Sequence, residues 1–117
     1  MNNGSPVVED ISLDQLKEGL ADGSILLVDV REPNEFEINR IPGAVLIPKG
    51  DFLNGTALEE LSRLTGGSKQ LVLHCKTGVR SAEALAVAKG AGYSDAVHVG
   101  GGVAAWVSQI DPSQPSY

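Results

Sequence analysis

The only cysteine of this sequence stands in a segment whose residue types suit nucleophilic chemistry. An apolar run over residues 71–73 leads through His74 to Cys75, and Gly78 and Arg80 follow before a helix-compatible stretch. A strand that passes through a tight loop into a helix aims backbone N–H groups and the positive end of the helix dipole at the loop. Such surroundings stabilise a thiolate, the nucleophilic form of cysteine. We therefore take Cys75 as the candidate nucleophile.

The loop after this cysteine combines a flexible residue with positive charge. Four residues separate Cys75 from Arg80. Gly78 permits a positive φ, while Lys76 and Arg80 place cations that could attract an anionic donor or acceptor. Inward N–H groups would hold the anionic end of a persulfide as well as a thiolate. The predicted site comprises Cys75 and Arg80 as catalytic residues and Lys76, Thr77, Gly78, Val79 and Ser81 as the active-site loop.

A buried structural cysteine is the alternative interpretation of Cys75, because free cysteine is among the residue types most often found in protein cores. The flanking lysine, glycine and arginine weigh against it, since a purely apolar site has no use for them.

Strand-like and helix-like segments alternate along the chain and would position this loop. Apolar runs predict strands over residues 25–30, 45–47, 71–74 and 96–99. Helical spacing of apolar residues predicts helices over residues 13–22, 33–38, 58–64, 81–91 and 103–110. Ser12 and Thr56 are the expected N-caps of the first and third of these helices, and Pro33 is the expected opening residue of the second. Short buried strands separated by helices predict an α/β fold, a parallel sheet with helices on both faces. Asp29, Cys75 and Gly100 fall at carboxyl ends of strands, where such sheets bind ligands.

Four motifs stand along the chain in an order known from one family. Cys-x-x-Gly-x-Arg at 75–80 looks like that family's active-site loop, and Asp-x-Arg at 29–31 resembles its strand end. Ile-Pro-Gly-Ala at 41–44 matches its turn, and the glycines at 100–102 with Trp106 are similar to its closing Gly-Gly-x-x-x-Trp. The family is the rhodanese domain, a sulfurtransferase fold. The resemblance runs from about Ile11 to the C-terminus and implies one rhodanese domain over 7–117 behind a leader or linker at 1–6.

A narrower likeness lies in residues 75–83 and the ending 110–117. Both resemble the C-terminal rhodanese domains of MoeB/MoeZ-type adenylyltransferase/sulfurtransferases, which activate the Gly-Gly end of a ubiquitin-like sulfur carrier and convert it to a thiocarboxylate. The resemblance implies that Cys75 carries sulfane sulfur as a persulfide, with no other cofactor and no metal. The implied donor is thiosulfate or a cysteine-desulfurase persulfide, and the implied acceptor is such a carrier, serving molybdopterin, thiamine, cysteine or thiolated-tRNA synthesis.

Two features qualify this likeness. The sequence has neither a Gly-rich nucleotide loop nor a paired Cys-x-x-Cys, so it is either an excised domain, with an adenylyltransferase domain in its parent chain, or a stand-alone relative. The family usually has Gly-His before Ile-Pro-Gly-Ala, and this chain has Asn39 and Arg40 there. The effect of that change stays open.

Other polar residues are interpreted as structural support. Asp29 and Arg31 could be site residues, but they are more simply expected to fix the strand end through an ion pair or loop hydrogen bonds and to support the site indirectly. Adjacent strand residues point to opposite faces, so His74 should face away from the Cys75 site. His98 belongs to no motif and should be packed or exposed. Trp106 is expected in the core, with a wall of the site pocket as the alternative. Glu32, Glu35 and Glu37 are expected on a solvated face rather than at a metal site.

Composition narrows the functions further. A chain of 117 residues is sufficient for one domain, and its net charge of −6 disfavours non-specific nucleic-acid binding. No apolar run approaches the roughly 20 residues of a membrane span. A lone cysteine excludes an internal disulfide and a multi-cysteine zinc site, and it fits the reducing cytoplasm.

Two alternative functions remain beside sulfur transfer. Cysteine phosphatases related to this fold have one more residue between Cys and Arg, which makes room for a phosphoryl group. Rhodanese-like domains also occur as non-catalytic docking modules, here for a sulfur carrier, although the intact Cys75 loop weighs against that role.

Overall fold

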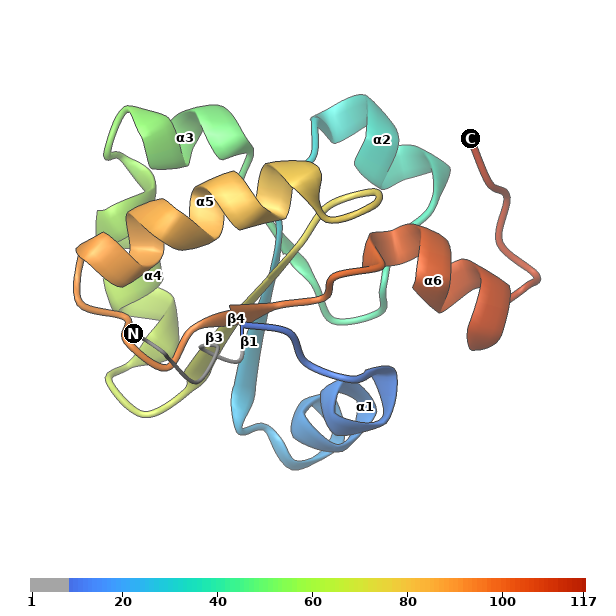
Figure 1. Ribbon diagram of the computed structural model, residues 1–117, viewed down its shortest axis with the longest axis horizontal. Coiled ribbons are helices and arrows are strands. Elements are labelled where there is room, and N and C mark those ends of the chain that lie inside the picture. Colours follow the sequence, from blue (N-terminus) through green and yellow to red (C-terminus); the bar gives the residue numbers. More distant parts are fainter. Residues whose placement is uncertain (1–8) are drawn as a thin grey trace, which may run out of the picture.

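Four parallel strands form the centre of the fold (Figure 1). A computed structural model describes residues 9–117, so the expected leader at 1–6 and the first two residues of the expected domain lie outside the described residues. The strands lie in the order β2-β1-β3-β4. Their bounds are Ile25–Asp29 for β1, Val45–Leu46 for β2, Gln70–His74 for β3 and Val97–His98 for β4.

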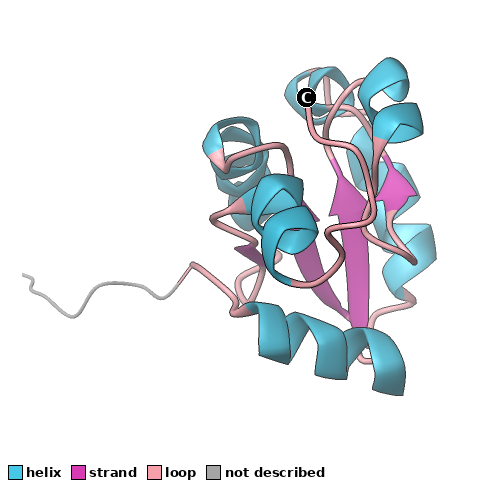
Figure 2. Ribbon diagram, turned by 90° about the vertical axis from the view of Figure 1, so that its right-hand side faces the viewer, coloured by secondary structure: helices cyan, strands magenta, loops and turns pink. Residues whose placement is uncertain are grey.

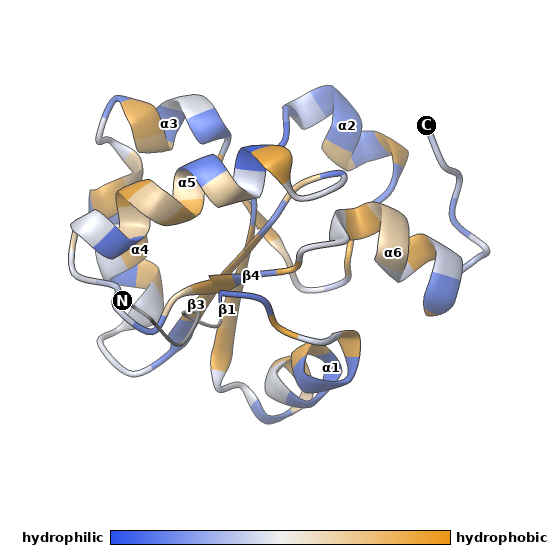
Figure 3. Cartoon of the chain, viewed as in Figure 1, coloured by the Kyte–Doolittle hydropathy of each residue, from blue (hydrophilic) through white to orange (hydrophobic). Residues whose placement is uncertain are grey.

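Helices cover both faces of this sheet (Figure 2). The core cluster on one face takes side chains from α3, α4 and α5, and the cluster on the other face takes side chains from α1 and α6. Figure 3 shows apolar strands at the centre and a largely polar α2. The helices are α1 (Leu13–Asp22), α2 (Pro33–Ile38), α3 (Lys49–Leu53), α4 (Ala57–Thr65), α5 (Val79–Gly90) and α6 (Gly102–Gln109). The predicted α/β fold with a parallel sheet is confirmed.

The central pair of strands aligns the residues that matter for the site. All five residues of β1 are buried, and the last four of β3 are buried, as expected for strands covered on both faces. Their register places Val28 opposite Leu73 and Asp29 opposite His74. Both strands therefore end at the same edge of the sheet, where the Cys75 loop begins.

Most predicted elements are present, with three differences. The helix expected over residues 81–91 begins earlier, at Val79, so that Arg80 lies in its first turn. The five-residue α3 was not predicted, because it is too short to show a helical repeat of apolar residues. Thr56 occupies the predicted N-cap position of α4, but its hydroxyl bonds the Asn54 side chain at 2.7 Å and caps no helix N–H. Ser12, in contrast, caps α1 through a reciprocal capping box with Gln15.

Candidate active site

The Cys75 thiol lies in the loop between β3 and α5, as the sequence predicts. The cysteine is buried, and its Sγ accepts a hydrogen bond from the Gly78 N–H at 3.1 Å. The thiol also contacts the hydroxyl of Ser81, in the first turn of α5, at an Sγ–Oγ distance of 3.5 Å. The predicted arrangement of inward donors around the sulfur is therefore present.

These donors decide the ionisation of the thiol. Burial by itself raises the pKa of Cys75, because the charged form is poorly solvated. Hydrogen bonds from the Ser81 hydroxyl and from the backbone N–H groups of Ser81, Gly78 and Thr77 outweigh burial and hold the pKa below its usual value. A lowered pKa enlarges the thiolate fraction near neutral pH, which favours nucleophilic attack.

Gly78 allows the loop to approach the segment after β4. Its φ is +106°, and a Cβ there would lie 2.3 Å from the Gly100 carbonyl oxygen. The start of α6 fixes the loop from the same side: Val103 N–H donates to the Cys75 carbonyl at 2.9 Å and Ala104 N–H donates to the Lys76 carbonyl at 3.1 Å. The glycine run at 100–102 therefore packs against the active-site loop, which gives the Gly-Gly-x-x-x-Trp motif a physical role.

Arg80 is held at the rim of the loop by α2. Its guanidinium bonds both carboxylate oxygens of Glu35, at 2.6 and 2.9 Å. This pairing raises the pKa of Arg80 and lowers that of Glu35 to about 2. The expectation of a solvated face at α2 is correct for Glu32 and Glu37 but wrong for Glu35, whose side chain is only 13% exposed. The helix dipole disfavours a positive charge in the first turn of α5, and the Glu35 carboxylate offsets this effect.

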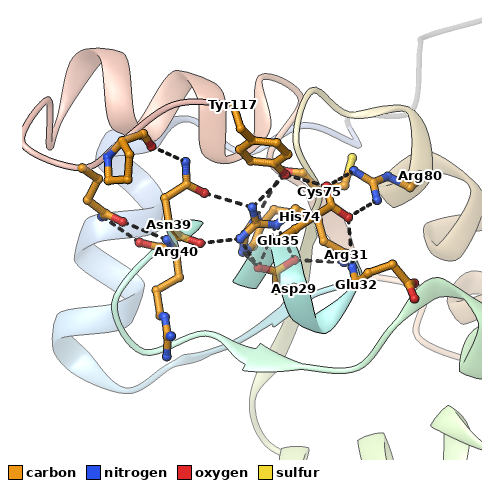
Figure 4. Close-up of polar contacts among 12 residues, drawn as sticks. Asp29, Arg31, Glu32, Glu35, Asn39, Arg40, His74, Cys75, Arg80 and Tyr117 are labelled. Atoms are coloured by element: carbon orange, nitrogen blue, oxygen red, sulfur yellow. Dashed lines mark hydrogen bonds and ion pairs between the residues drawn. The ribbon is translucent and has the colours of Figure 1, made fainter. Parts of the chain in front are cut away.

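Asp29 and Arg31 form a fully buried ion pair, as predicted (Figure 4). Arg31 Nη2 lies 2.7 Å from Asp29 Oδ2, and Nε contacts both carboxylate oxygens at 3.0 Å. The rest of the guanidinium donates to the Asn39 side chain and carbonyl and to the Tyr117 hydroxyl, at 2.7–2.9 Å. Burial alone would lower the pKa of Arg31, but the contacts with Asp29 and Tyr117 raise it. The partners of Arg31 outside the pair are Asn39 and Tyr117 rather than Cys75.

The C-terminal tail, residues 111–117, docks where the chain departs from the family pattern. Asn39 Nδ2 donates to the Pro115 carbonyl at 2.7 Å. Gln114 brackets the Arg40 backbone, accepting from its N–H and donating to its carbonyl, both at 2.8 Å. The Asn39 side chain therefore joins Arg31 to the tail. The glycine that the family usually has at this position has no side chain to make these two hydrogen bonds.

Tyr117 extends the tail to the rim of the site. Its hydroxyl donates to Glu35 at 2.6 Å and accepts from Arg31, and its ring lies under the Lys76 ammonium, 4.3 Å from Nζ to the centroid. Lys76 and Arg80 are thus both positioned by residues that the predicted site did not include. Thr77 and Val79 expose their side chains on the outer side of the loop.

The remaining candidates take the places expected of them, with one exception. His74 is buried, and its ring contacts the Asp29 carboxylate and the Cys75 carbonyl rather than the thiol; burial lowers its pKa. Trp106, a residue of α6, lies in the core cluster on the face of the sheet that α1 and α6 cover. His98 is half-buried as expected, but its ring contacts Ser81, a connection that the sequence did not indicate.

Over residues 9–117, no cluster of His, Cys, Asp and Glu is arranged to hold a metal. None of the helices described is long and apolar enough to cross a membrane.

Comparison with known proteins accounts for this geometry. Residues 12–109 match the family described as Rhodanese-like domain. The chain belongs to this family. MoeZ of Mycobacterium tuberculosis, named a probable adenylyltransferase/sulfurtransferase, is 47% identical over 104 residues, and the match covers 88% of this chain and 26% of MoeZ. The rhodanese-like domain described here therefore spans about a quarter of the length of that relative.

Relatives closer to its own length also resemble this rhodanese-like domain. Thiosulfate:glutathione sulfurtransferase of Saccharomyces cerevisiae is 33% identical over 86% of this chain and 79% of that protein. The structure of the human single-domain sulfurtransferase TSTD1 superposes with a TM-score of 0.73 at 29% identity, covering 88% of this chain and 98% of that one. Both of these relatives, which are close to this chain in length, are named sulfurtransferases.

Proposed function

We propose that this rhodanese-like domain carries sulfane sulfur as a persulfide on Cys75 and delivers it to a nucleophilic acceptor. In the first step the Cys75 thiolate attacks the outer sulfur of thiosulfate, the S–S bond of thiosulfate breaks, and sulfite leaves with the electron pair. In the second step the acceptor attacks the outer persulfide sulfur, and the Cys75 thiolate leaves. Both steps are covalent, and the enzyme returns to its starting state without another cofactor.

The observation that supports this proposal is the donor arrangement around a buried Sγ in a four-residue loop. The Gly78 N–H and the Ser81 hydroxyl stabilise the thiolate that attacks and the thiolate that leaves. Lys76 and Arg80 supply positive charge at the rim, where an anionic donor such as thiosulfate would arrive. A cysteine-desulfurase persulfide is a second donor of the same chemistry.

The test is a cyanide assay on the purified chain. Incubation with thiosulfate should add one sulfur atom to Cys75, visible by mass spectrometry, and cyanide should then release thiocyanate. Cys75→Ala should abolish both signals. Thiocyanate formation that survives Cys75→Ala, or its absence from the wild type, would overturn the proposal, and Cys75-dependent hydrolysis of an aryl phosphate would favour a phosphatase instead.

For the acceptor, we propose the activated C-terminus of a ubiquitin-like sulfur-carrier protein. Its adenylylated carbonyl carbon is an electrophile, so here the second step runs the other way: the outer persulfide sulfur attacks that carbon and AMP leaves. A dithiol reductant then cleaves the S–S bond of the acyl persulfide, which releases the carrier thiocarboxylate and the Cys75 thiol while the dithiol becomes a disulfide. The support is the 47% identity with MoeZ and the 30% identity with Drosophila ananassae MOCS3, both named as adenylyltransferases and sulfurtransferases. The partner domain that activates the carrier would lie in the same parent chain or in a separate protein. A reactive thiol of this kind fits the reducing cytoplasm.

A competition experiment separates acceptor classes. The persulfide form of the chain is mixed with an adenylylated sulfur carrier, and with glutathione as the small-thiol control. Faster transfer to the carrier is the expected outcome, detected by mass spectrometry as a disulfide-linked adduct of Cys75 and the carrier that a dithiol reductant converts to the carrier thiocarboxylate. Equal or faster transfer to glutathione would assign a small-thiol acceptor, and binding of the carrier without transfer would indicate a docking role.

A further inference from the structure

A histidine from a neighbouring strand reaches the reactive cysteine through one serine. His98 lies at the end of β4, and its Nδ1 is 2.8 Å from the Ser81 Oγ. Ser81 is completely buried, and the same oxygen is 3.5 Å from Cys75 Sγ and 3.2 Å from the Gly78 carbonyl oxygen. The register of β3 and β4 places His98 beside Leu73, two residues before the cysteine. Backbone pairing of the sheet therefore fixes the imidazole relative to the loop.

The hydroxyl of Ser81 has a single hydrogen and three neighbours that compete for it. When Cys75 is a neutral thiol, its S–H donates to Ser81, and the Ser81 hydrogen is free to point at His98 Nδ1. When Cys75 is a thiolate, the sulfur only accepts, so a hydrogen bond between the two groups requires the Ser81 hydrogen to turn toward the sulfur. The 2.8 Å contact is then a hydrogen bond only if His98 Nδ1 carries a hydrogen and donates to Ser81.

We propose that His98 is a positioning residue for Cys75, which donates from Nδ1 to Ser81 and so directs the only hydroxyl hydrogen of Ser81 at the sulfur anion. Without this donor, the Gly78 carbonyl at 3.2 Å competes for that hydrogen. Two acidic residues, Glu9 and Asp10, belong to the segment that pairs with β4 at His98. The Asp10 carboxylate accepts from the Gly100 N–H at 2.7 Å, and the Glu9 carbonyl accepts from the His98 N–H. From α5, Ser81 contacts the imidazole and Cys75 lies behind that hydroxyl.

This role affects both halves of sulfur transfer, and that part of the inference rests on the proposed function. A stabilised thiolate forms at lower pH and leaves faster when the acceptor attacks the outer sulfur. Loss of the His98 donor should therefore slow discharge of the persulfide most clearly. The effect of His98 on the pKa of the free Cys75 thiol does not depend on sulfur transfer, so it can be measured even if the proposed reaction is wrong.

The first experiment follows alkylation of Cys75 by iodoacetamide as a function of pH. His98→Phe keeps an aromatic ring without a donor and should reduce thiol ionisation about tenfold, which is an upward pKa shift of about 1. His98→Asn keeps an N–H group near the position of Nδ1 and should retain most of the wild-type profile. Ser81→Ala should shift the profile in the same direction, and adding His98→Phe to Ser81→Ala should add nothing.

Two results would overturn the inference. One is a His98→Phe profile equal to that of the wild type. The other is an equal shift caused by His98→Phe with and without the Ser81 hydroxyl, which would show that the ring does not act through Ser81. If His98→Phe fails to fold, nitrogen NMR of the wild-type imidazole decides: a protonated Nδ1 above the ionisation pH of Cys75 supports the inference, and an unprotonated Nδ1 in the thiolate state contradicts it.

Discussion

Gly78 meets two separate demands within the active-site loop. Its φ of +106° lies in a region that L residues rarely adopt, and its missing Cβ leaves space for the Gly100 carbonyl oxygen. The first demand is conformational, whereas the second joins the loop to the segment after β4. The two can be separated because Gly92 has nearly the same φ, +108°, with no heavy atom within 4 Å of its ideal Cβ.

Gly78→Ala should therefore destabilise the fold more than Gly92→Ala. Strained backbone alone costs of order 1–3 kcal/mol in either variant, and the clash with Gly100 should add about 1–3 kcal/mol to the free-energy cost in Gly78→Ala. Denaturant unfolding measures this difference, and the cyanide assay should show activity lost in Gly78→Ala and kept in Gly92→Ala. Equal stabilities of the two variants would mean that the close approach to Gly100 carries no weight.

At the scale of elements, α2 and α5 are joined by the bidentate pair of Glu35 and Arg80. The Glu35 pKa is held at about 2, below its ordinary 4.5, with the Arg80 bonds as the main cause. Because the folded-state pKa is depressed, the pair stabilises the fold fully above the unfolded-state pKa. That stabilisation is lost as the pH falls from about 4.5 through about 2.

Glu35→Gln should thus cost stability at neutral pH but little in acid. We expect a loss of about 1–3 kcal/mol at pH 7, typical of hydrogen bonds to charged groups, and a much smaller difference from the wild type near pH 2. Glu37→Gln, an exposed position on the same helix, is the matched control and should stay within about 0.5 kcal/mol at either pH. A Glu35→Gln cost that does not change with pH would contradict an ionic origin.

The C-terminal tail also joins two elements, because Tyr117 connects α2 to the loop after β3. The Tyr117 hydroxyl is shared by Arg31 and Glu35, so Tyr117→Phe removes one hydroxyl and leaves two charged groups with one partner fewer. A loss of about 1–3 kcal/mol in the free energy of unfolding is expected. Since Glu35 also holds Arg80, the KM for thiosulfate should rise in the same variant.

Tyr93 provides the comparison for that substitution. It packs against the core cluster on the face of the sheet that α4 and α5 cover, so Tyr93→Phe should leave the KM for thiosulfate unchanged. If Tyr93→Phe and Tyr117→Phe change the KM equally, the tail does not influence the site.

At the scale of the whole molecule, local patterns in the sequence were sufficient for the sheet and most helices. The apolar runs of β1 and β3 and the end signals of α1 and α2 each lie within a few consecutive residues, so they can be recognised without the fold. The connections between elements could not be recognised in that way. Glu35 meets Arg80 across 45 residues, Asn39 meets Pro115 across 76, and His98 meets Ser81 across 17. Those contacts depend on strand order, which no local pattern encodes.

The buried pair of Asp29 and Arg31 tests this long-range organisation most directly. It links the end of β1 to the turn at Asn39 and to the tail, and both side chains are completely inaccessible to solvent. Removing one partner of a buried ion pair leaves an unpaired charge in the interior, so Asp29→Asn should lower the free energy of unfolding by about 3–5 kcal/mol. Glu83→Gln, which breaks the exposed pair with Lys49, is the control and should cost less than about 1 kcal/mol. Similar costs for the two variants in urea unfolding would show that Arg31 is solvated after the carboxylate is lost, and that the strand end, the turn and the tail are not held together through it.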